Sequence, residues 1–275
     1  MVSPASITFG QSAVLSTDLL SYYRQVSQST LTVVDLETTG STADKARVIE
    51  VSVLQASLDD GIHHQDTHLI NPGVKVPAMI TRVTGITPAM VGQGKLPEDV
   101  WPDLLPRLEQ GVLTAHNIEF DYRFIQSEYR HMDFKFTRPP QMQFCTVLLS
   151  RLLLADLPSR SLPDLVKHFK FDVGPSHRAE ADTTACWLLA EYLLQQIRAE
   201  SDEVLLGRFA QQWVRLRDAA KLLKCSKYKA QKILDGQGAE CRTSRRNTRF
   251  LYRRRDVERV YYELQGQQLS LNGMA

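Results

Sequence analysis

The apolar residues of this chain recur with two different periods, and each period predicts one kind of element. Runs of β-branched and apolar residues bounded by turn residues are typical of buried strands, and they occur at residues 31–40, 46–56, 63–70 and 112–115. Apolar residues spaced three and four apart predict amphipathic helices at residues 17–28, 97–110, 120–131, 146–154, 161–169 and 180–197. Pro and Gly interrupt residues 76–91, so short helical turns are expected there. We interpret the first strand as the centre of an α/β domain.

This first strand, LTVVDLETTG, carries two carboxylates near its end. Because side chains alternate along a strand, Asp35 and Glu37 share one face, roughly 7 Å apart at about 3.3 Å per residue. Two acids at the end of a buried strand repel each other and lose solvation, which raises a carboxyl pKa unless a cation lies between them. Oxygen ligands favour Mg²⁺ or Mn²⁺, whereas zinc sites use His and Cys, which are absent nearby. The pair is equally compatible with solvated residues at a sheet edge.

Two further acids and a histidine follow downstream. Asp121, in HNIEFDYRFI, lies in the first turns of a predicted helix that Asn117 can cap. An acid near the positive end of a helix is also explained without any site. Asp182 lies on the apolar stripe of the helix predicted at residues 180–197, so its carboxylate points inward and needs a partner. On a continuous helix His177 would lie about 140° away from Asp182, so it reaches the same place only from a preceding loop; a surface histidine is the alternative.

Composition and charge narrow the possible classes of protein. The 275 residues are 43% hydrophobic and 23% charged, which is ordinary for a globular protein without a membrane span. The N-terminal MVSPASITFGQSAVL lacks the features of a signal peptide, and the four cysteines form no Cys-x-x-Cys pair. We therefore expect a cytoplasmic protein without a disulfide framework or a zinc site.

The net charge of +2 is unevenly distributed along the chain. Residues 1–200 carry 17 Lys and Arg against 23 Asp and Glu, whereas residues 201–275 carry 16 against 8. A strongly basic segment joined to a mildly acidic one suggests binding to phosphate backbones. A solvated basic surface is the alternative.

The basic segment predicts a small separate module. Helices are expected at residues 217–223 and 227–234, the second capped by Ser226. A β-hairpin with its tip at residues 245–247 and a helix at residues 256–264 follow. The arrangement resembles the winged helix-turn-helix of excisionase and MerR-type proteins, with Lys224 where such turns often have a glycine. This resemblance implies nucleic-acid contacts by Lys227, Lys229, Lys232, Arg245, Arg246 and Arg249. A basic module that binds a protein is the alternative.

Three motifs of the larger part form one ordered set. Asp-x-Glu-Thr-Thr-Gly, Asn-x-x-Phe-Asp and His-x-x-x-x-Asp occur over about residues 30–197, joined by the segment INPGVKVPAMITRVTGITPAMV. Together they resemble the DEDDh exonucleases of the DnaQ family, which includes the proofreading domains of bacterial replicative polymerases. The resemblance implies a ribonuclease-H-like mixed five-stranded sheet flanked by helices. It also implies two-metal hydrolysis that releases nucleoside 5′-monophosphates from a 3′ end.

By motif position, the resemblance gives each residue an expected role. His177 is the expected general base. Two divalent ions, Mg²⁺ or Mn²⁺, are expected to bind to Asp35, Glu37, Asp121 and Asp182. The terminal nucleotide is expected to contact Thr38, Thr39, Gly40, Asn117 and Phe120. The last two residues of that set are equally explained as a helix cap and a core side chain.

The chain is therefore expected to consist of five parts. They are a lead-in at residues 1–30, an exonuclease domain at 31–199, a linker at 200–212, the winged helix-turn-helix at 213–265 and a flexible tail at 266–275. The tail contains Gln268-Leu269-Ser270-Leu271, which is similar to the peptide by which replication proteins dock on the sliding clamp, with Asn272 where an aromatic is usual. A chance match in a tail that contains Gln and Leu is the alternative.

The sequence as a whole predicts a metal-dependent 3′→5′ exonuclease that acts on DNA in proofreading or repair. Its expected partners are nucleic acid, with DNA preferred to RNA, and the sliding clamp or a polymerase, but no membrane. One alternative is an enzyme that trims RNA 3′ ends, since the motifs do not discriminate the sugar. The other is a DNA-binding regulator with a vestigial nuclease domain, which the presence of all four acids and the histidine disfavours.

Overall fold

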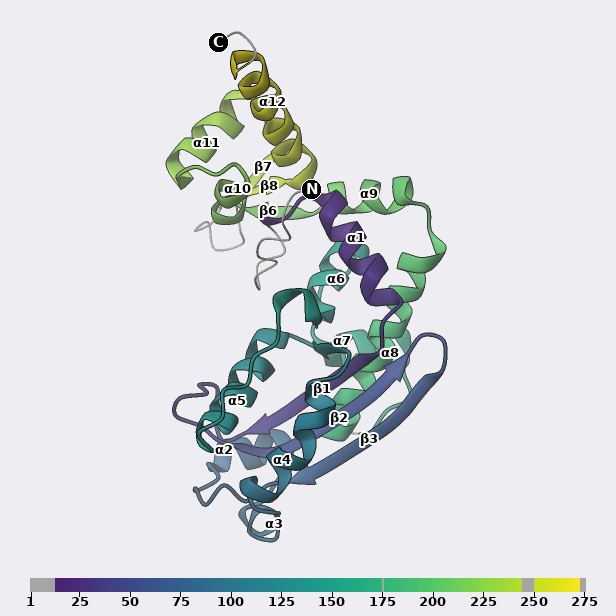
Figure 1. Ribbon diagram of the computed structural model, residues 1–275, viewed down its shortest axis with the longest axis vertical. Coiled ribbons are helices and arrows are strands. Elements are labelled where there is room, and N and C mark those ends of the chain that lie inside the picture. The colour runs from purple at the N-terminus through teal and green to yellow at the C-terminus, as the bar shows by residue number, and fades with distance from the viewer. Residues whose placement is uncertain (1–12, 175, 244–249, 273–275) are drawn as a thin grey trace. The chain divides into compact units, whose positions relative to one another are not determined.

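The structure is a computed structural model that describes residues 13–174, 176–243 and 250–272 (Figure 1). The chain forms two compact units. Among the described residues, the large unit consists of those in 24–150 and 157–199, and the basic unit consists of those in 13–23, 151–156 and 200–272. All five predicted catalytic residues belong to the large unit.

A mixed five-stranded sheet forms the centre of the large unit. The strand order is β3-β2-β1-β4-β5, with β2 antiparallel to β1 and β3, and β4 parallel to β1 and β5. The strands are β1 (Leu31–Thr38), β2 (Val48–Ser57), β3 (Gly61–Leu69), β4 (Val112–Ala115) and β5 (Gln143–Cys145). The first strand is central, as predicted. The three-residue β5 is not among the strands located from the sequence, because so short a run carries no measurable period.

Helices cover both faces of this sheet (Figure 1). α4 (Pro97–Leu108) and α5 (Ile118–Arg130) pack on one face, and α8 (Ala179–Ala199) packs on β1 and β2 from the other. Shorter helices of the chain up to α8 are α2 (Ala78–Thr84), α3 (Pro88–Gly92), α6 (Thr146–Leu153) and α7 (Leu162–Phe169), and α1 (Ser16–Ser27) precedes the first strand. These agree with the predicted helices to within a few residues.

Alternation along β1 places its two acids on the face that α8 covers. Val34 and Leu36 join the core formed with α4 and α5, so Asp35 and Glu37 point to the opposite face. Both acids are the partly exposed positions of a strand that is otherwise buried. On the neighbouring β2 and β3, Gln65 donates hydrogen bonds both to the Ser52 hydroxyl (3.3 Å) and to a backbone carbonyl of α8 (3.1 Å), which marks the same face.

The basic unit contains a second, antiparallel sheet of order β6-β8-β7. Its strands are β6 (Trp213–Arg215), β7 (Cys241–Thr243) and β8 (Phe250–Arg253), and its helices include α10 (Leu216–Leu222), α11 (Lys227–Gly236) and α12 (Arg254–Asn272). Ser226 caps α11, as predicted, by accepting a hydrogen bond from the Lys229 N–H (3.2 Å). Lys224 takes a left-handed conformation with φ 50°, so the turn between α10 and α11 closes without the expected glycine.

Two boundaries in the basic unit differ from the prediction. The segment 200–212, expected to be a linker, contains α9 (Asp202–Ala210), which buries Leu205 and Phe209. A single i, i+4 apolar pair is too weak a pattern to reveal a helix from sequence. α12 continues through Asn272, so the expected flexible tail is helical up to that residue. The predicted wing residues Arg245, Arg246 and Arg249, and the side chains of Gln268 to Leu271, lie outside the described residues.

No helix in the described part of the chain combines the length and the apolar character needed to span a bilayer. Cytoplasmic placement stays a prediction.

Candidate active site

The first two elements of the candidate site meet because β4 runs parallel to β1. Parallel neighbours end at the same edge of a sheet, so the chain that leaves β4 enters α5 beside the end of β1. Asn117 occupies the N-cap position in a left-handed conformation with φ 83°, but its side chain makes no capping hydrogen bond with the described residues, contrary to expectation. α5 begins at Ile118 rather than at residue 120, and its first turn carries Asp121, which is 4% exposed.

The last acid and the histidine come from the start of α8. Because α8 begins at Ala179, His177 lies outside the helix, with φ 64°. This placement is the one that allows His177 and Asp182 to share a site. The His177 N–H donates a hydrogen bond to Oδ2 of Asp182 (2.9 Å). Side-chain ligand atoms of Glu37, His177 and Asp182 all lie within 4.8 Å of one another. Three of the five predicted residues therefore converge directly.

Asp35 and Asp121 belong to the same electrostatic cluster. Burial raises the pKa of Asp35 well above its usual value, and the charges of Asp121, Asp182, Glu37 and Glu50 add to the rise. Burial also raises the pKa of Asp121, although backbone hydrogen bonds oppose the change and the Glu37 charge adds to it. Carboxylates shift one another's pKa in this way when they are close together. The four predicted acids thus occupy one region.

Negative charge outweighs positive charge in this region. Burial, with the charges of Asp182 and Glu50, raises the pKa of Glu37 to about 7, and Arg178 opposes the rise. Burial raises the pKa of Asp182, and His177 opposes it through its N–H and its charge. Added cations would relieve this repulsion. A donor set of carboxylate oxygens with one imidazole fits hard divalent ions such as Mg²⁺ or Mn²⁺.

The Thr-Thr-Gly turn after β1 is held by its own side chains. The Thr38 hydroxyl donates to the carbonyl of Gly40 (2.7 Å), and the Arg47 N–H donates to Oγ1 of Thr39 (2.9 Å). A Cβ built on Gly40 would lie 3.4 Å from the Cβ of Ala46. These contacts therefore fix the turn that directly follows the two acids of β1.

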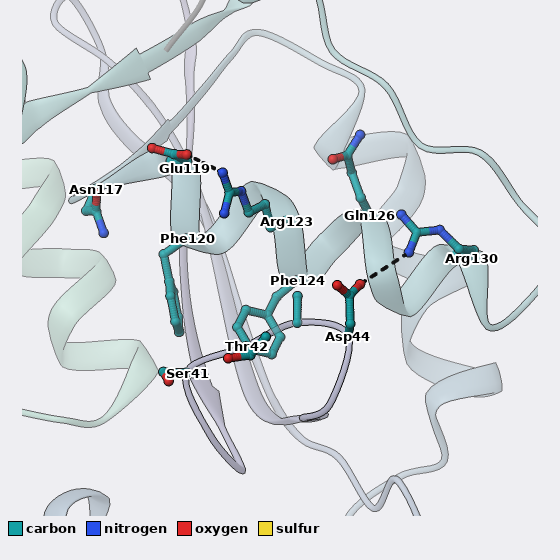
Figure 2. Close-up of a pocket in the computed structure, with 11 residues that line it drawn as sticks. Ser41, Thr42, Asp44, Asn117, Glu119, Phe120, Arg123, Phe124, Gln126 and Arg130 are labelled. Carbon is teal, nitrogen blue, oxygen red and sulfur yellow. Dashed lines mark hydrogen bonds and ion pairs between the residues drawn. The ribbon is translucent and has the colours of Figure 1, made fainter. Parts of the chain in front are cut away.

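A pocket of about 450 Å³ lies between α5 and the segment that follows this turn (Figure 2). Residues 41–44, which directly follow Gly40, form one wall. Asn117, at the N-cap, and Phe120, in the first turn of α5, line the other, and the Phe120 ring lies 4.8 Å from that of Phe124 between centroids. The structure thus places two of the five predicted substrate residues in one pocket, and one of them, Phe120, directly precedes the candidate metal ligand Asp121.

Two charged residues of this region were not predicted from the sequence. Glu50 is buried on β2 directly opposite Glu37, and Arg178 follows His177. The signals were available, since a glutamate inside the apolar run VIEV is unusual for a buried strand and an arginine adjoins the predicted base. Neither signal indicates that the two residues meet.

Comparison with known proteins identifies the larger part of the chain. Residues 32–189 match the exonuclease family RNase T, and this range contains all five signature positions. The chain belongs to this exonuclease family. The exonuclease is 33% identical over 157 residues to the DNA polymerase III subunit epsilon of Aquifex aeolicus (strain VF5), a match that covers 56% of this chain and 75% of the relative.

Other relatives are much longer than the matched region. A PolC-type DNA polymerase III of Clostridium perfringens (strain 13 / Type A) is 32% identical over 171 residues, which is 62% of this exonuclease chain but 12% of that protein. Among solved structures, the nuclease domain of 3′hExo, described as a DEDDh family member bound to rAMP, covers 61% of this chain and 92% of its own at 16% identity, with a TM-score of 0.51. That likeness confirms the predicted fold, a ribonuclease-H-like mixed sheet flanked by helices.

Proposed function

We propose that this exonuclease removes nucleoside 5′-monophosphates from the 3′ end of DNA and uses two divalent ions, Mg²⁺ or Mn²⁺. The observation that carries the proposal is the approach of Glu37, His177 and Asp182 to within 4.8 Å of one another. Asp35 and Asp121 extend the same cluster and raise its negative charge. A phosphodiester is anionic and repels nucleophiles, so its hydrolysis requires positive charge, which this cluster can recruit.

The residues divide the chemistry between them. The four acids would hold the divalent ions, which supply charge to neutralise the scissile phosphate and the leaving 3′ oxygen. His177, whose side chain is exposed beside Glu37 and Asp182, accepts the proton of the attacking water. Its main chain is tied to Asp182 through the N–H, which helps to keep the imidazole beside the two acids.

The pocket and the turn supply the contacts for the terminal nucleotide. Phe120 offers an aromatic surface on which a base can stack, and Asn117 offers amide donors and acceptors. Thr38, Thr39 and Gly40 form the turn that directly precedes residues 41–44 of the pocket wall, and backbone of this turn is the expected further contact. The two polymerase relatives are DNA polymerase III proteins by name, which favours DNA. RNA is the second candidate substrate, because a structural neighbour binds rAMP.

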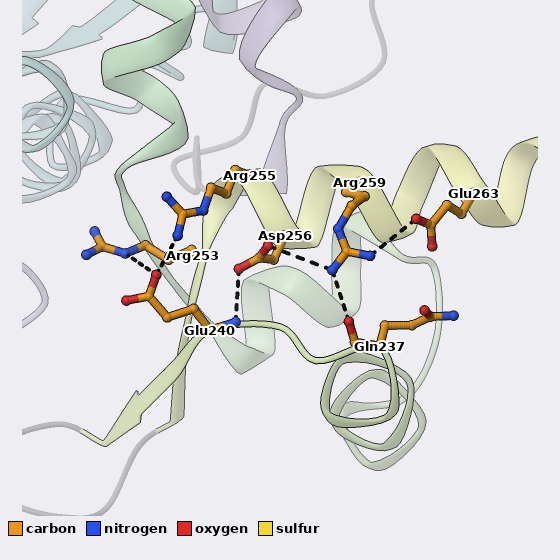
Figure 3. Close-up of polar contacts among 7 residues, drawn as sticks. All are labelled: Gln237, Glu240, Arg253, Arg255, Asp256, Arg259 and Glu263. Carbon is orange, nitrogen blue, oxygen red and sulfur yellow. Dashed lines mark hydrogen bonds and ion pairs between the residues drawn. The ribbon is translucent and has the colours of Figure 1, made fainter.

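Within the same proposal, the basic unit is a winged helix-turn-helix that tethers the enzyme to nucleic acid. α10 and α11 pack against each other, and α11 exposes Lys227, Lys229 and Lys232. These lysines form no ion pair with the residues that the structure describes. Arginines of β8 and α12 are compensated instead: Arg253 (3.2 Å) and Arg255 (2.7 Å) both pair with Glu240 (Figure 3). The lysine face of α11 therefore has charge left for phosphates.

Association with a polymerase or with the sliding clamp is part of the proposal and has weaker support. The Aquifex aeolicus relative is named as a subunit of DNA polymerase III. The clamp-like peptide Gln268 to Leu271 has only its sequence in favour of it.

The decisive experiment follows the shortening of 5′-labelled single-stranded DNA, duplex DNA and RNA with Mg²⁺, with Mn²⁺ and with a chelator. We expect stepwise loss from the 3′ end of DNA that needs a divalent ion. Asp182→Asn should abolish this loss while the circular dichroism of the protein stays unchanged. Faster digestion of RNA would select the second candidate, and absence of digestion under all conditions would leave the vestigial-domain alternative.

A further inference from the structure

Glu50 is a buried carboxylate beside the acid cluster, and the proposed reaction assigns it no role. It lies opposite Glu37 in the antiparallel pairing of β1 and β2, and it is 1% exposed. Arg178 donates its Nε–H to both carboxylate oxygens (3.2 Å each) and an Nη2–H to Oε1 (2.6 Å). The N–H of Ala179 donates to Oε2 (2.9 Å). The charge of Glu50 is therefore compensated by the protein itself, unlike that of its neighbours.

These contacts attach the segment next to His177 to the sheet. Arg178 is the residue between His177 and Ala179, the first residue of α8. On the other side, the His177 N–H donates to Asp182, and the Asp182 N–H donates back to the carbonyl of Arg178 (2.9 Å). His177 has a left-handed conformation, φ 64°, which is uncommon for a residue with a side chain, and these hydrogen bonds on both sides of it help to hold that conformation.

We propose that Glu50 is a positioning residue for His177. Through Arg178 and Ala179 it fixes the backbone from which the imidazole reaches Glu37 and Asp182. The inference rests on the proposed function, because it requires His177 to be the general base. A base must stay within hydrogen-bond reach of its proton, and a displacement of about 1 Å can lower a rate about 100-fold. Loss of Glu50 should therefore slow proton transfer more than it weakens substrate binding.

The large unit contains a matching pair that does not contact His177. Glu128 on α5 is also 1% exposed. It accepts hydrogen bonds from Nε (3.0 and 3.2 Å) and Nη2 (2.8 Å) of Arg47 and from the N–H of the next residue, Val48 (3.0 Å). Each glutamate thus binds an arginine fork and the N–H that follows it. Glu128→Gln is therefore a control for the loss of such a pair at a place that does not hold the backbone of His177.

The test measures kcat and KM of the full chain on single-stranded DNA with Mn²⁺ for Glu50→Gln and Glu128→Gln. We expect Glu50→Gln to lower kcat about 10–100-fold and to change KM less than about threefold, whereas Glu128→Gln leaves kcat within about twofold. In a His177→Ala background, Glu50→Gln should change the residual rate less than about threefold, because no imidazole remains to be positioned. Independent, multiplicative losses, or equal losses in the two single variants, overturn the inference.

A second readout does not depend on activity. In the metal-free protein, the imidazole NMR signal of His177, assigned with His177→Ala, should shift in Glu50→Gln and stay in place in Glu128→Gln; an unmoved signal in both overturns the inference. If Glu50→Gln does not fold, Arg178→Lys replaces it with the same expectations, since lysine keeps the charge but cannot form the fork. A wild-type protein that digests no 3′ end overturns the proposed function instead.

Discussion

Asp121 and Glu128 lie about two turns apart on α5, and both side chains are buried. Their surroundings are nevertheless opposite. Glu128 receives two arms of the Arg47 guanidinium and a backbone N–H. Asp121 lies among other carboxylates, and burial with the nearby charge of Glu37 raises its pKa.

The contrast distinguishes two uses of buried charge in one domain. A carboxylate that is held by an arginine fork is neutralised inside the protein and can serve as a fixed joint. A group of carboxylates without enough cations of its own keeps a negative charge that an ion from solution can neutralise. Depth of burial alone would not separate Asp121 from Glu128, whereas the balance of charge around each one does.

Asp121→Asn has the largest expected effect, because it changes the acid of this comparison that is a candidate metal ligand. We expect kcat to fall about a thousandfold or more, about 4 kcal/mol of barrier, because one candidate metal ligand loses its charge. The metal-free protein should become more stable by about 1–2 kcal/mol, most clearly at high pH, since a buried carboxylate whose ionisation is unfavourable is removed. Digestion of labelled DNA and urea unfolding in a chelator measure the two effects. A variant that is inactive but less stable would mean that Asp121 is mainly structural.

Glu128→Gln should have the opposite pair of effects. The free energy of unfolding should fall by about 2–3 kcal/mol, because the Arg47 guanidinium loses its charged partner at a largely buried place. The loss should be the same with and without Mg²⁺, as measured by urea unfolding. The control is kcat, which should stay within about twofold. A kcat as low as that of Asp121→Asn would show that charge balance does not separate the two acids.

The candidate site was predictable from sequence wherever a residue belongs to a local motif. Asp35 and Glu37 share a face because a strand alternates, and His177 must precede α8 because of the helical angle to Asp182. Glu50 could not be assigned in this way. Its role depends on the register that sets it opposite Glu37 and on the residue at which α8 begins, and both are results of tertiary packing.

The elements of the fold also differ in how well the sequence predicts them. β1, β2 and β3 contain eight or more residues each and were recognisable by their period, whereas the three-residue strands β5 and β6 were not. α9 was missed because one buried apolar pair defines its inner face. The order of the strands in the sheet was not predicted from any periodicity, because pairing depends on contacts between distant segments.

The same contrast predicts how the stability of the metal-free protein depends on pH. The pKa of Glu37 rises from 4.5 to about 7 on folding, so folding binds protons. The stability that protonation supplies is complete below about pH 4.5 and is lost as the pH rises through 7. Asp35, Asp121 and Asp182 shift in the same direction. Between pH 5 and 8 in a chelator, the free energy of unfolding should therefore fall by about 2 kcal/mol.

Thermal unfolding at several pH values tests this slope. Saturating Mg²⁺ should remove most of it, because the ion takes the place of the protons. Glu37→Gln should reduce the slope, and Glu128→Gln should leave it unchanged although it lowers stability throughout. If Glu37→Gln keeps the full slope of stability against pH, the slope has its origin outside the acid cluster.

The smallest expected effect concerns the basic unit, where charges with and without partners are again found together. Arg259 of α12 pairs with Glu263 (3.2 Å) and Asp256 (3.8 Å) (Figure 3), whereas Lys227, Lys229 and Lys232 of α11 are exposed without such partners among the described residues. Each phosphate contact that a lysine makes releases counterions, so affinity for duplex DNA should fall steeply with salt.

Replacing the three lysines by glutamine should make the negative slope of log affinity against log salt less steep, by about 2–3. Fluorescence anisotropy with labelled duplex DNA measures this slope. Arg259→Gln should change the slope by less than about 0.5, because its charge is already compensated within α12. Equal effects of the lysine and arginine variants would mean that the whole unit binds as a diffuse basic surface. A flat salt profile of the unmodified protein would instead favour a protein partner, since a phosphate backbone cannot be bound by lysines without displacing its counterions.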